Sequence, residues 1–170
     1  REVPANEVAQ GSPIPVATGE MYDTVGQFFT LAAAGGVHIF QPEPMSLGGI
    51  GNTLAVAQLA QAHGSWIAPH QSGGPVATAL CLQLAACVPN FLIQEHFDPF
   101  NDPWTTELVT WRPGLDAATG HLSLPTEPGL GLELVDEVAA AHPYDENAYL
   151  NVWAEGWERR LGRGETADAG

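Results

Sequence analysis

The sequence predicts an α/β fold in which a parallel sheet is built from about four consecutive βα units. Short apolar runs alternate with helix-like stretches of about 10–15 residues, which is the pattern of βαβ units. Each apolar run ends in a polar residue, and these polar residues are spaced 23, 27 and 25 positions apart. Parallel strands joined by right-handed crossovers have their carboxyl ends on one rim, so the polar residues should share that rim.

The helices are predicted from their ends. A helical pattern runs over 25–34, and Thr24 and Gln27 before and within it have the spacing of a capping box. For the second helix we expect Asn52 or Thr53 as the N-cap, after a glycine-rich turn. The third helix opens at Pro75, a permitted early position for proline, and runs to about residue 87. The four strands are predicted at Ile14–Ala17, Val37–Phe40, Trp66–Ala68 and Asn90–Ile93.

The composition of the chain changes after Glu95, where prolines and tryptophans become frequent. We expect Leu108–Trp111 and His121–Leu124 to pair as a hairpin across the turn-rich segment 113–120. A short helix is predicted over 135–141.

The charge of the chain excludes several kinds of partner and of chemistry. The 170 residues carry 20 Asp and Glu against 5 Arg, a net charge of −15, and no lysine. We therefore expect no nucleic acid and no anionic membrane surface as partner, and no lysine-based catalysis. Cys81 and Cys87 lie in an apolar helical run, where we expect buried small hydrophobic side chains rather than a disulfide framework. The expected location is the reducing cytoplasm.

Four polar side chains follow the four predicted strands: Glu20, Glu43, His70 and Glu95. In barrels and in open α/β sheets, this rim is where binding and catalytic sites are built. A single glutamate after a strand is usually a solvated loop residue, and a histidine behind a proline is often a turn residue. The joint pattern at one period is what favours a site.

The four side chains have complementary chemistry. Glu20 is a hard oxygen ligand suited to Mg²⁺, and His70 is a natural general base or acid near neutral pH. Glu43 is placed to orient the imidazole, and Glu95, when protonated, to donate to a developing oxyanion. Together they suit proton abstraction α to a carboxylate. His96 and Asp98 follow Glu95 and are candidate substrate contacts, although a loop role is at least as plausible.

Several ordered motifs resemble a known family, the C-terminal part of the enolase superfamily. Within it the mandelate racemase subgroup, and its acid-sugar dehydratases of the galactonate type, are most similar. The resemblance covers roughly residues 13–135. The motifs that carry it are Ile14–Glu20, Gln41–Glu43 with Gly48–Ile50, Ala68–His70 with Gly74–Pro75, Ile93–Glu95 and Pro125–Gly131.

The resemblance implies a (β/α)₇β TIM-like barrel, of which this chain is the C-terminal half plus an extension that completes a cap. It implies Mg²⁺-assisted removal of the proton α to the carboxylate of a sugar acid, followed by loss of water. Glu20 then corresponds to the third metal ligand, on the fifth strand, and His70 to the base or acid on the seventh. Glu43 takes the place of the partner of that histidine on the sixth strand, and Glu95 that of the group that binds the substrate carboxylate on the eighth.

Two departures from the family pattern affect what we expect of this chain. The partner of the histidine is usually aspartate, and here it is Glu43. The family's other metal ligands and catalytic groups lie upstream of the matching region, where this chain has only residues 1–13. We therefore expect little or no activity from the chain alone, and either a homo-oligomer or a need for the missing N-terminal half.

The expected organisation has four parts, and the expected function has two alternatives. Residues 1–13 are a lead-in, 14–100 the half-barrel, 101–161 a meander that contacts the cap, and 162–170 a disordered tail. The alternatives to a dehydratase are a racemase or epimerase on the same scaffold, and a non-catalytic truncated remnant or interaction module.

Overall fold

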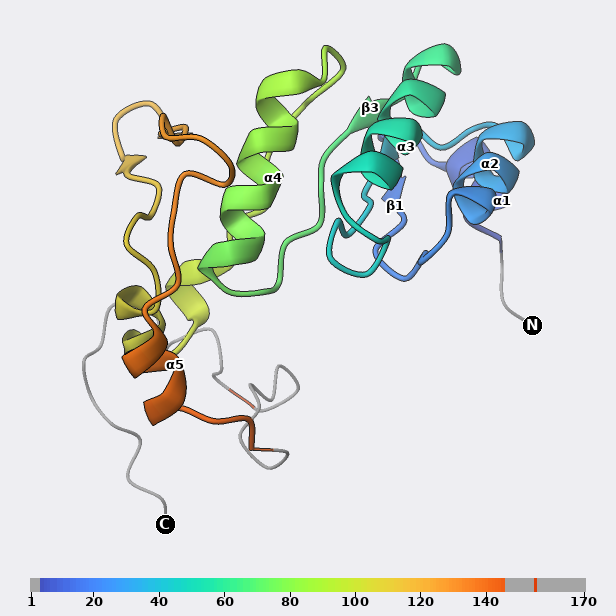
Figure 1. Ribbon diagram of the computed structural model, residues 1–170. Helices are drawn as coiled ribbons and strands as arrows, with labels where there is room; N and C mark the ends of the chain where they lie inside the picture. Colours follow the sequence, from blue (N-terminus) through green and yellow to red (C-terminus); the bar gives the residue numbers. More distant parts are fainter. Residues whose placement is uncertain (1–3, 146–154, 156–170) are drawn as a thin grey trace.

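The computed structural model describes residues 4–145 and residue 155 (Figure 1). Three strands form a parallel sheet in the order β1-β2-β3, with Ala17 opposite Ile39 and Ile39 opposite Trp66. The strands are short, and the fourth predicted strand is reduced to one parallel bridge between Ile67 and Phe91. The sheet strands are β1 (Ala17–Thr18), β2 (Ile39–Phe40) and β3 (Trp66–Ile67), and the connecting helices are α2 (Val25–Ala34), α3 (Ile50–Ala62) and α4 (Pro75–Cys87).

The predicted alternation of strands and helices is confirmed, and a buried aromatic core holds the first units together. Phe28 of α2 and Phe40 of β2 are almost fully buried, with their ring centroids 5.8 Å apart. Val56 of α3 and Ile67 of β3 are buried in the same cluster. Because these side chains come from successive βα units, the core fixes the strands relative to one another and thereby the positions of their ends.

Residues before the first strand include a short helix, α1 (Ala5–Gly11), in the segment that we predicted as a lead-in. Ala9 on this helix is buried in the same core cluster as α2. The backbone of Asn6 approaches Gly36 so closely that a side-chain carbon at Gly36 would lie 3.4 Å from the Asn6 carbonyl oxygen. This segment therefore packs against the first βα unit.

The helix ends follow the capping signals at α2 and α4 but not at α3. Thr24 and Gln27 form the predicted capping box, and α4 begins at Pro75 as predicted. The prediction of Asn52 or Thr53 as the N-cap of α3 is wrong, since Gly49 is the N-cap. Gly49 has φ +92°, a conformation that favours glycine, and it turns the chain into the helix earlier.

The C-terminal part contains a hairpin with a different partner from the one predicted. Strand β4 (Leu115–Asp116) pairs with β5 (His121–Leu122), while Val109 bridges Leu134 instead. The Asp116 carboxylate accepts hydrogen bonds from the Ala118 N–H and the Thr119 hydroxyl, and these bonds close a tight turn at Asp116. The helix predicted over 135–141 is confirmed as α5 (Asp136–Ala141), and two 3₁₀ turns precede the hairpin, η1 (Asp98–Phe100) and η2 (Pro103–Glu107).

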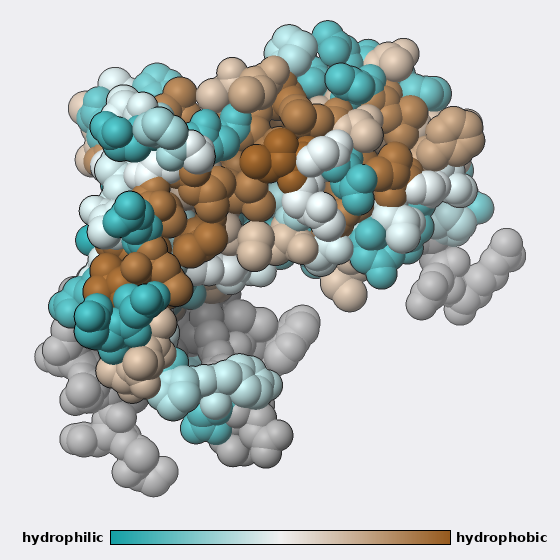
Figure 2. All heavy atoms as spheres, in the orientation of Figure 1, coloured by the Kyte–Doolittle hydropathy of each residue, from teal (hydrophilic) through white to brown (hydrophobic). Residues whose placement is uncertain are grey.

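The surface carries exposed apolar side chains, and Figure 2 shows apolar atoms gathered across the middle of the face in view. Leu92 and Ile93, next to the last parallel bridge, are 45% and 64% exposed. Of the two cysteines, Cys81 is buried as predicted, but Cys87 is exposed. Within the described ranges we find no helix long and apolar enough to cross a membrane. The tail predicted over 162–170 lies outside the described residues.

Candidate active site

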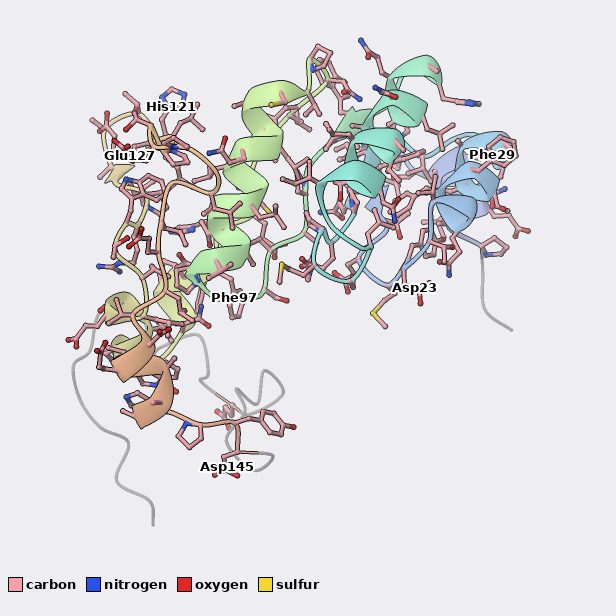
Figure 3. All side chains as sticks on the ribbon, viewed as in Figure 1. Asp23, Phe29, Phe97, His121, Glu127 and Asp145 are labelled. Atoms are coloured by element: carbon pink, nitrogen blue, oxygen red, sulfur yellow. The ribbon has the colours of Figure 1, made fainter. Side chains whose placement is uncertain are left out.

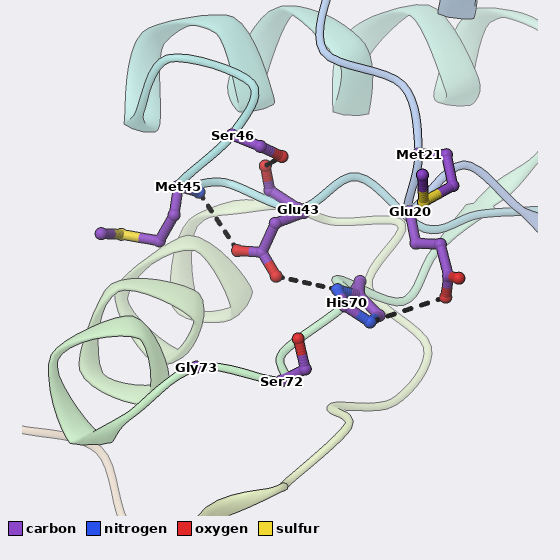
Figure 4. Close-up of a pocket in the computed structure, with 8 residues that line it drawn as sticks. All are labelled: Glu20, Met21, Glu43, Met45, Ser46, His70, Ser72 and Gly73. Carbon is purple, nitrogen blue, oxygen red and sulfur yellow. Dashed lines mark hydrogen bonds and ion pairs between the residues drawn. The ribbon is translucent and has the colours of Figure 1, made fainter. Parts of the chain in front are cut away.

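The other three predicted rim residues, Glu20, Glu43 and Glu95, surround the His70 imidazole. Figure 4 shows Glu20 and Glu43 beside this imidazole. Its Nδ1 lies 2.8 Å from Glu43 Oε2, and its Nε2 lies 3.5 Å from Glu20 Oε2. Glu95 Oε2 lies 3.9 Å from the same Nε2. The sequence spacing therefore predicted a real three-dimensional cluster.

The contact between Glu43 and His70 is the best defined contact of the cluster. Both side chains are largely buried, 13% and 17% exposed respectively. Glu43 Oε1 accepts a hydrogen bond from the Met45 N–H at 3.2 Å, and its other oxygen faces His70 Nδ1. An ionised carboxylate only accepts hydrogen bonds, so Glu43 selects an imidazole that carries a proton on Nδ1, and Nε2 is turned toward Glu20 and Glu95.

The backbone around each side chain explains how the rim is held. The His70 N–H donates to the Pro42 carbonyl at 3.0 Å, which sets the His70 and Glu43 loops side by side. Gly19, directly before Glu20, has φ +136°, and a side-chain carbon there would lie 2.7 Å from the buried Phe28 ring. Glu20 itself is 58% exposed, so it is placed by its backbone rather than by packing of its side chain.

A small open cavity of about 260 Å³ lies beside His70. Its volume is close to the lower end of the range for small-molecule sites. Met21, Met45 and Ser72 were not predicted as site residues, and nothing in the sequence marks them apart from their place after strand ends. The cavity is lined by Glu20, Met21, Glu43, Met45, Ser46, His70, Ser72 and Gly73.

The two predicted substrate contacts are not brought into this cavity. His96 lines a second cavity of about 710 Å³, which also borders α4 and the β4–β5 hairpin. Asp98 Oδ1 accepts a hydrogen bond from the Thr78 hydroxyl at 2.7 Å and lies 3.5 Å from the amide nitrogen of Gln71. Asp98 is thus engaged with the protein itself.

Sequence reasoning missed Gln71, the residue directly after His70. Its side chain is fully buried, at 0% exposure, and its backbone N–H donates to Glu95 Oε2 at 3.1 Å. A buried amide beside a rim histidine has no distinctive sequence pattern, so only its adjacency to His70 was available as a signal.

The described residues do not fit a complete Mg²⁺ site. Across residues 4–145 no group of three or more His, Cys, Asp and Glu side chains is arranged to hold a metal ion. The Glu43 carboxylate is bound by His70 and Met45, and Glu95 is bound by the Gln71 N–H. Glu20 remains as one exposed carboxylate, whereas Mg²⁺ requires near-octahedral oxygen coordination.

Burial sets the chemistry of the cysteine beneath the site. The Cys81 thiol lies 3.8 Å from the His70 carbonyl oxygen. Desolvation, and then the nearby Glu43 charge, raise the pKa of the Cys81 thiol to about 12. The thiol therefore stays protonated at neutral pH and acts as a packing group.

Comparison with known proteins places this arrangement in a family. The family of enolase C-terminal domain-like proteins matches residues 3–138. A D-galactonate dehydratase from Verminephrobacter eiseniae is 32% identical over 153 residues, which are 86% of this chain and 40% of that protein. A D-galactarolactone cycloisomerase from Agrobacterium fabrum is 36% identical over 135 residues, 75% of this chain and 35% of that protein.

Solved structures agree with the sequence comparison. A mandelate racemase/muconate lactonizing enzyme from Jannaschia sp. CCS1 superposes with a TM-score of 0.76 at 38% identity, over 85% of this chain and 36% of that one. This chain thus spans two fifths or less of the length of these relatives. The predicted α/β fold is confirmed, and the chain belongs to the enolase C-terminal domain-like family, in its mandelate racemase branch.

Proposed function

We propose that this chain supplies one side of the active site of a hydro-lyase that removes water from a small sugar acid. The observation that carries the proposal is the His70 imidazole, which lines an open cavity and is held by Glu43 at Nδ1, while its Nε2 lies 3.5 Å from Glu20 Oε2. The relative that is named a D-galactonate dehydratase supports the reaction class.

His70 is proposed as the general base or acid at the carbon next to the substrate carboxylate. Its neutral Nε2 would take the α-proton, and the Glu43 carboxylate would stabilise the imidazolium that results. A positioned general base of this kind contributes roughly 10²–10⁴-fold to the rate.

Glu95 is proposed to bind the substrate where negative charge develops. Its Oε2 already accepts the Gln71 N–H, which leaves its Oε1 as the oxygen that would carry a proton. A protonated carboxyl group can donate at one oxygen while it accepts at the other. Glu95 can therefore keep its backbone hydrogen bond and still donate to an oxyanion.

A substrate carboxylate entering this cluster meets three carboxylates within 4 Å of one imidazole, so electrostatic repulsion must be offset. Mg²⁺, when bound, would supply the positive charge that neutralises the substrate. We propose Glu20 as a single ligand of such an ion. The remaining ligands, and with them full activity, would come from residues outside those that the structure describes, for example in a second copy or in a segment like the rest of the longer relatives.

A second candidate reaction shares the proton abstraction but does not lose water, as in a racemase or epimerase. The solved structure that is named a mandelate racemase/muconate lactonizing enzyme supports this candidate, because racemisation removes the α-proton without loss of water. The two candidates differ in whether a hydroxyl group leaves after the α-proton has been removed.

The test is an NMR assay in D₂O with a panel of sugar acids and Mg²⁺. We would assay the chain alone and the chain joined to the N-terminal part of the Verminephrobacter eiseniae relative. We expect little turnover from the chain alone, and from the joined protein both loss of the α-proton signal and a dehydrated keto acid. Exchange of the α-proton without dehydration would favour the second candidate.

The matched variants for this assay are His70→Asn and Gln61→Asn, because Gln61 is an exposed polar residue on α3. His70→Asn should abolish α-proton exchange, and Gln61→Asn should leave it unchanged. Full activity of His70→Asn would overturn the assignment of the base.

A further inference from the structure

The loop that carries Glu95 is fastened to the His70 loop on both sides of Glu95. Before it, the Gln94 amide donates to the Pro69 carbonyl at 3.1 Å. After it, the Phe97 N–H donates to Gln71 Oε1 at 2.8 Å, and Phe97 lies at the N-terminal end of α4 in Figure 3. The Gln71 N–H then holds the Glu95 carboxylate itself. Every one of these bonds spans 24 residues or more of sequence.

The Gln71 side chain uses both of its polar atoms in this fastening. Its Oε1 accepts from Phe97, while its Nε2 donates to the Gly73 carbonyl at 2.8 Å and lies 3.5 Å from Asp98 Oδ1. Asp98 is in turn held by the buried Thr78 hydroxyl in the first turn of α4. The last two strand ends and the start of α4 are thus joined through one buried amide.

Only a primary amide satisfies these neighbours. A carboxylate at position 71 would accept the Phe97 N–H but would face the Gly73 carbonyl and the Asp98 carboxylate without a donor. An apolar side chain would remove both the acceptor of the Phe97 N–H and the donor to the Gly73 carbonyl, which would keep its hydrogen bond from the Asn101 amide at 3.1 Å. The pattern of donors and acceptors around Gln71 is therefore specific.

We propose that Gln71 is a positioning residue that holds the Glu95 carboxylate beside His70 Nε2. Its side chain acts on the loop at Phe97 and its backbone N–H acts on Glu95, so the side chain sets where the backbone hydrogen bond forms. The proposal that this position of the Glu95 carboxylate serves catalysis rests on the role proposed above for Glu95. The position itself, fixed by the hydrogen bond from the Gln71 N–H, can be tested without substrate.

The test follows the amide resonance of position 71 by ¹H–¹⁵N NMR on the full chain as the pH is lowered. This N–H donates to Glu95, so its resonance should move as the carboxylate becomes protonated, and Glu95→Gln should remove that movement. If the Gln71 side chain positions the Glu95 carboxylate, Gln71→Met should reduce the pH-dependent movement of this resonance to less than about half, because the charge-assisted hydrogen bond to Glu95 is lost. Gln83→Met is the matched control, since Gln83 bonds to Gly129 away from the site.

The outcomes separate positioning from simple stabilisation. A stabilising role alone would lower the urea midpoint of Gln71→Met while leaving the movement in the folded protein as large as in the wild type, and that result overturns the proposal. If Gln71→Met does not fold, Thr78→Val takes its place, because it loosens Asp98 without touching Gln71. We expect a smaller loss in the same direction, and an unchanged movement would overturn the proposal. If the Gln71 amide resonance responds as expected but no dehydratase activity is found, the positioning role of Gln71 stands and only the proposed function is refuted.

Discussion

At the scale of single residues, the Glu43 carboxylate is bound at both oxygens, by His70 Nδ1 and by the Met45 N–H. The resemblance described above leads us to expect a shorter aspartate at this position, and the structure shows how the longer Glu43 side chain reaches the imidazole. The hydrogen bond from Met45 turns the carboxylate, and the contact with His70 is short at 2.8 Å. A substitution that keeps the shape of the Glu43 side chain can therefore test the effect of its charge alone.

Glu43→Gln keeps the shape of the side chain but removes the charge. The His70 contact becomes a hydrogen bond between neutral groups, so we expect the free energy of unfolding near neutral pH to fall by about 1 kcal/mol. Urea denaturation followed by circular dichroism measures the change. Glu127→Gln, at an exposed position, is the control and should change it by less than about 0.5 kcal/mol. Equal effects of the two substitutions would contradict a charge-assisted bond at Glu43.

The two cysteines should differ sharply in reactivity. The pKa of the buried Cys81 thiol is raised to about 12, so at pH 8 almost none of it is thiolate, whereas Cys87 is exposed. In the folded chain we expect iodoacetamide to label one cysteine, identified by peptide mass spectrometry as Cys87. Labelling in urea should reach both. Rapid labelling of Cys81 without urea would show that α4 opens readily.

At the scale of elements, the capping box of α2 gives a prediction with an internal control. Thr24→Ala removes the side-chain oxygen that accepts the Gln27 N–H, and we expect a loss of about 1 kcal/mol in the free energy of unfolding. Thr30→Ala removes an exposed hydroxyl that donates to the Gly26 carbonyl in the same helix, so its effect should be near zero. Thermal and urea unfolding of both variants provide the comparison. A larger loss in Thr30→Ala would contradict the capping role.

Local signals account for what could be predicted from the sequence about these elements. The capping pair at Thr24 and the proline at Pro75 act on the residues next to them, so α2 and α4 begin where expected. The start of α3 depends on the backbone conformation of Gly49, which residue identity alone does not specify. The hairpin partner depended on side-chain bonds from Asp116, one of several turn-forming residues in that segment.

In the site, too, local sequence patterns predicted some features, while contacts between distant residues could not be predicted. Glu20, Glu43, His70 and Glu95 follow strand ends, and the parallel arrangement of the strands was sufficient to predict that they meet. Gln71 could not be predicted, because its role comes from hydrogen bonds to residues 24 or more positions away. Long-range polar contacts of this kind depend on loop conformations that periodicity does not encode.

At the scale of the whole molecule, the dominant feature is the net charge of −15 with no lysine. Like charges on a compact chain repel one another, and the repulsion is relieved when the chain expands. Acidic side chains also converge at the rim, where three carboxylates surround one imidazole. The folded chain should therefore be sensitive to ionic strength.

We expect the urea midpoint to rise when NaCl is increased from about 0.05 to about 0.5 M, because the Debye length falls well below the size of the molecule. KCl at the same ionic strength should give the same rise, whereas an equal osmolality of sucrose tests for effects other than screening. A midpoint that falls with salt would show that attractive ion pairs outweigh the repulsion.

Gly19, which has a positive φ, packs against the buried Phe28 ring and directly precedes Glu20 of the candidate site. Any side chain there would meet the Phe28 ring, so a substitution at Gly19 must move either the core or the adjacent Glu20. Adaptation to a new substrate can therefore proceed freely through exposed neighbours such as Met21, but it cannot proceed through Gly19. In this chain, sequence change at the rim is therefore limited by the packing of Phe28, a fully buried aromatic ring.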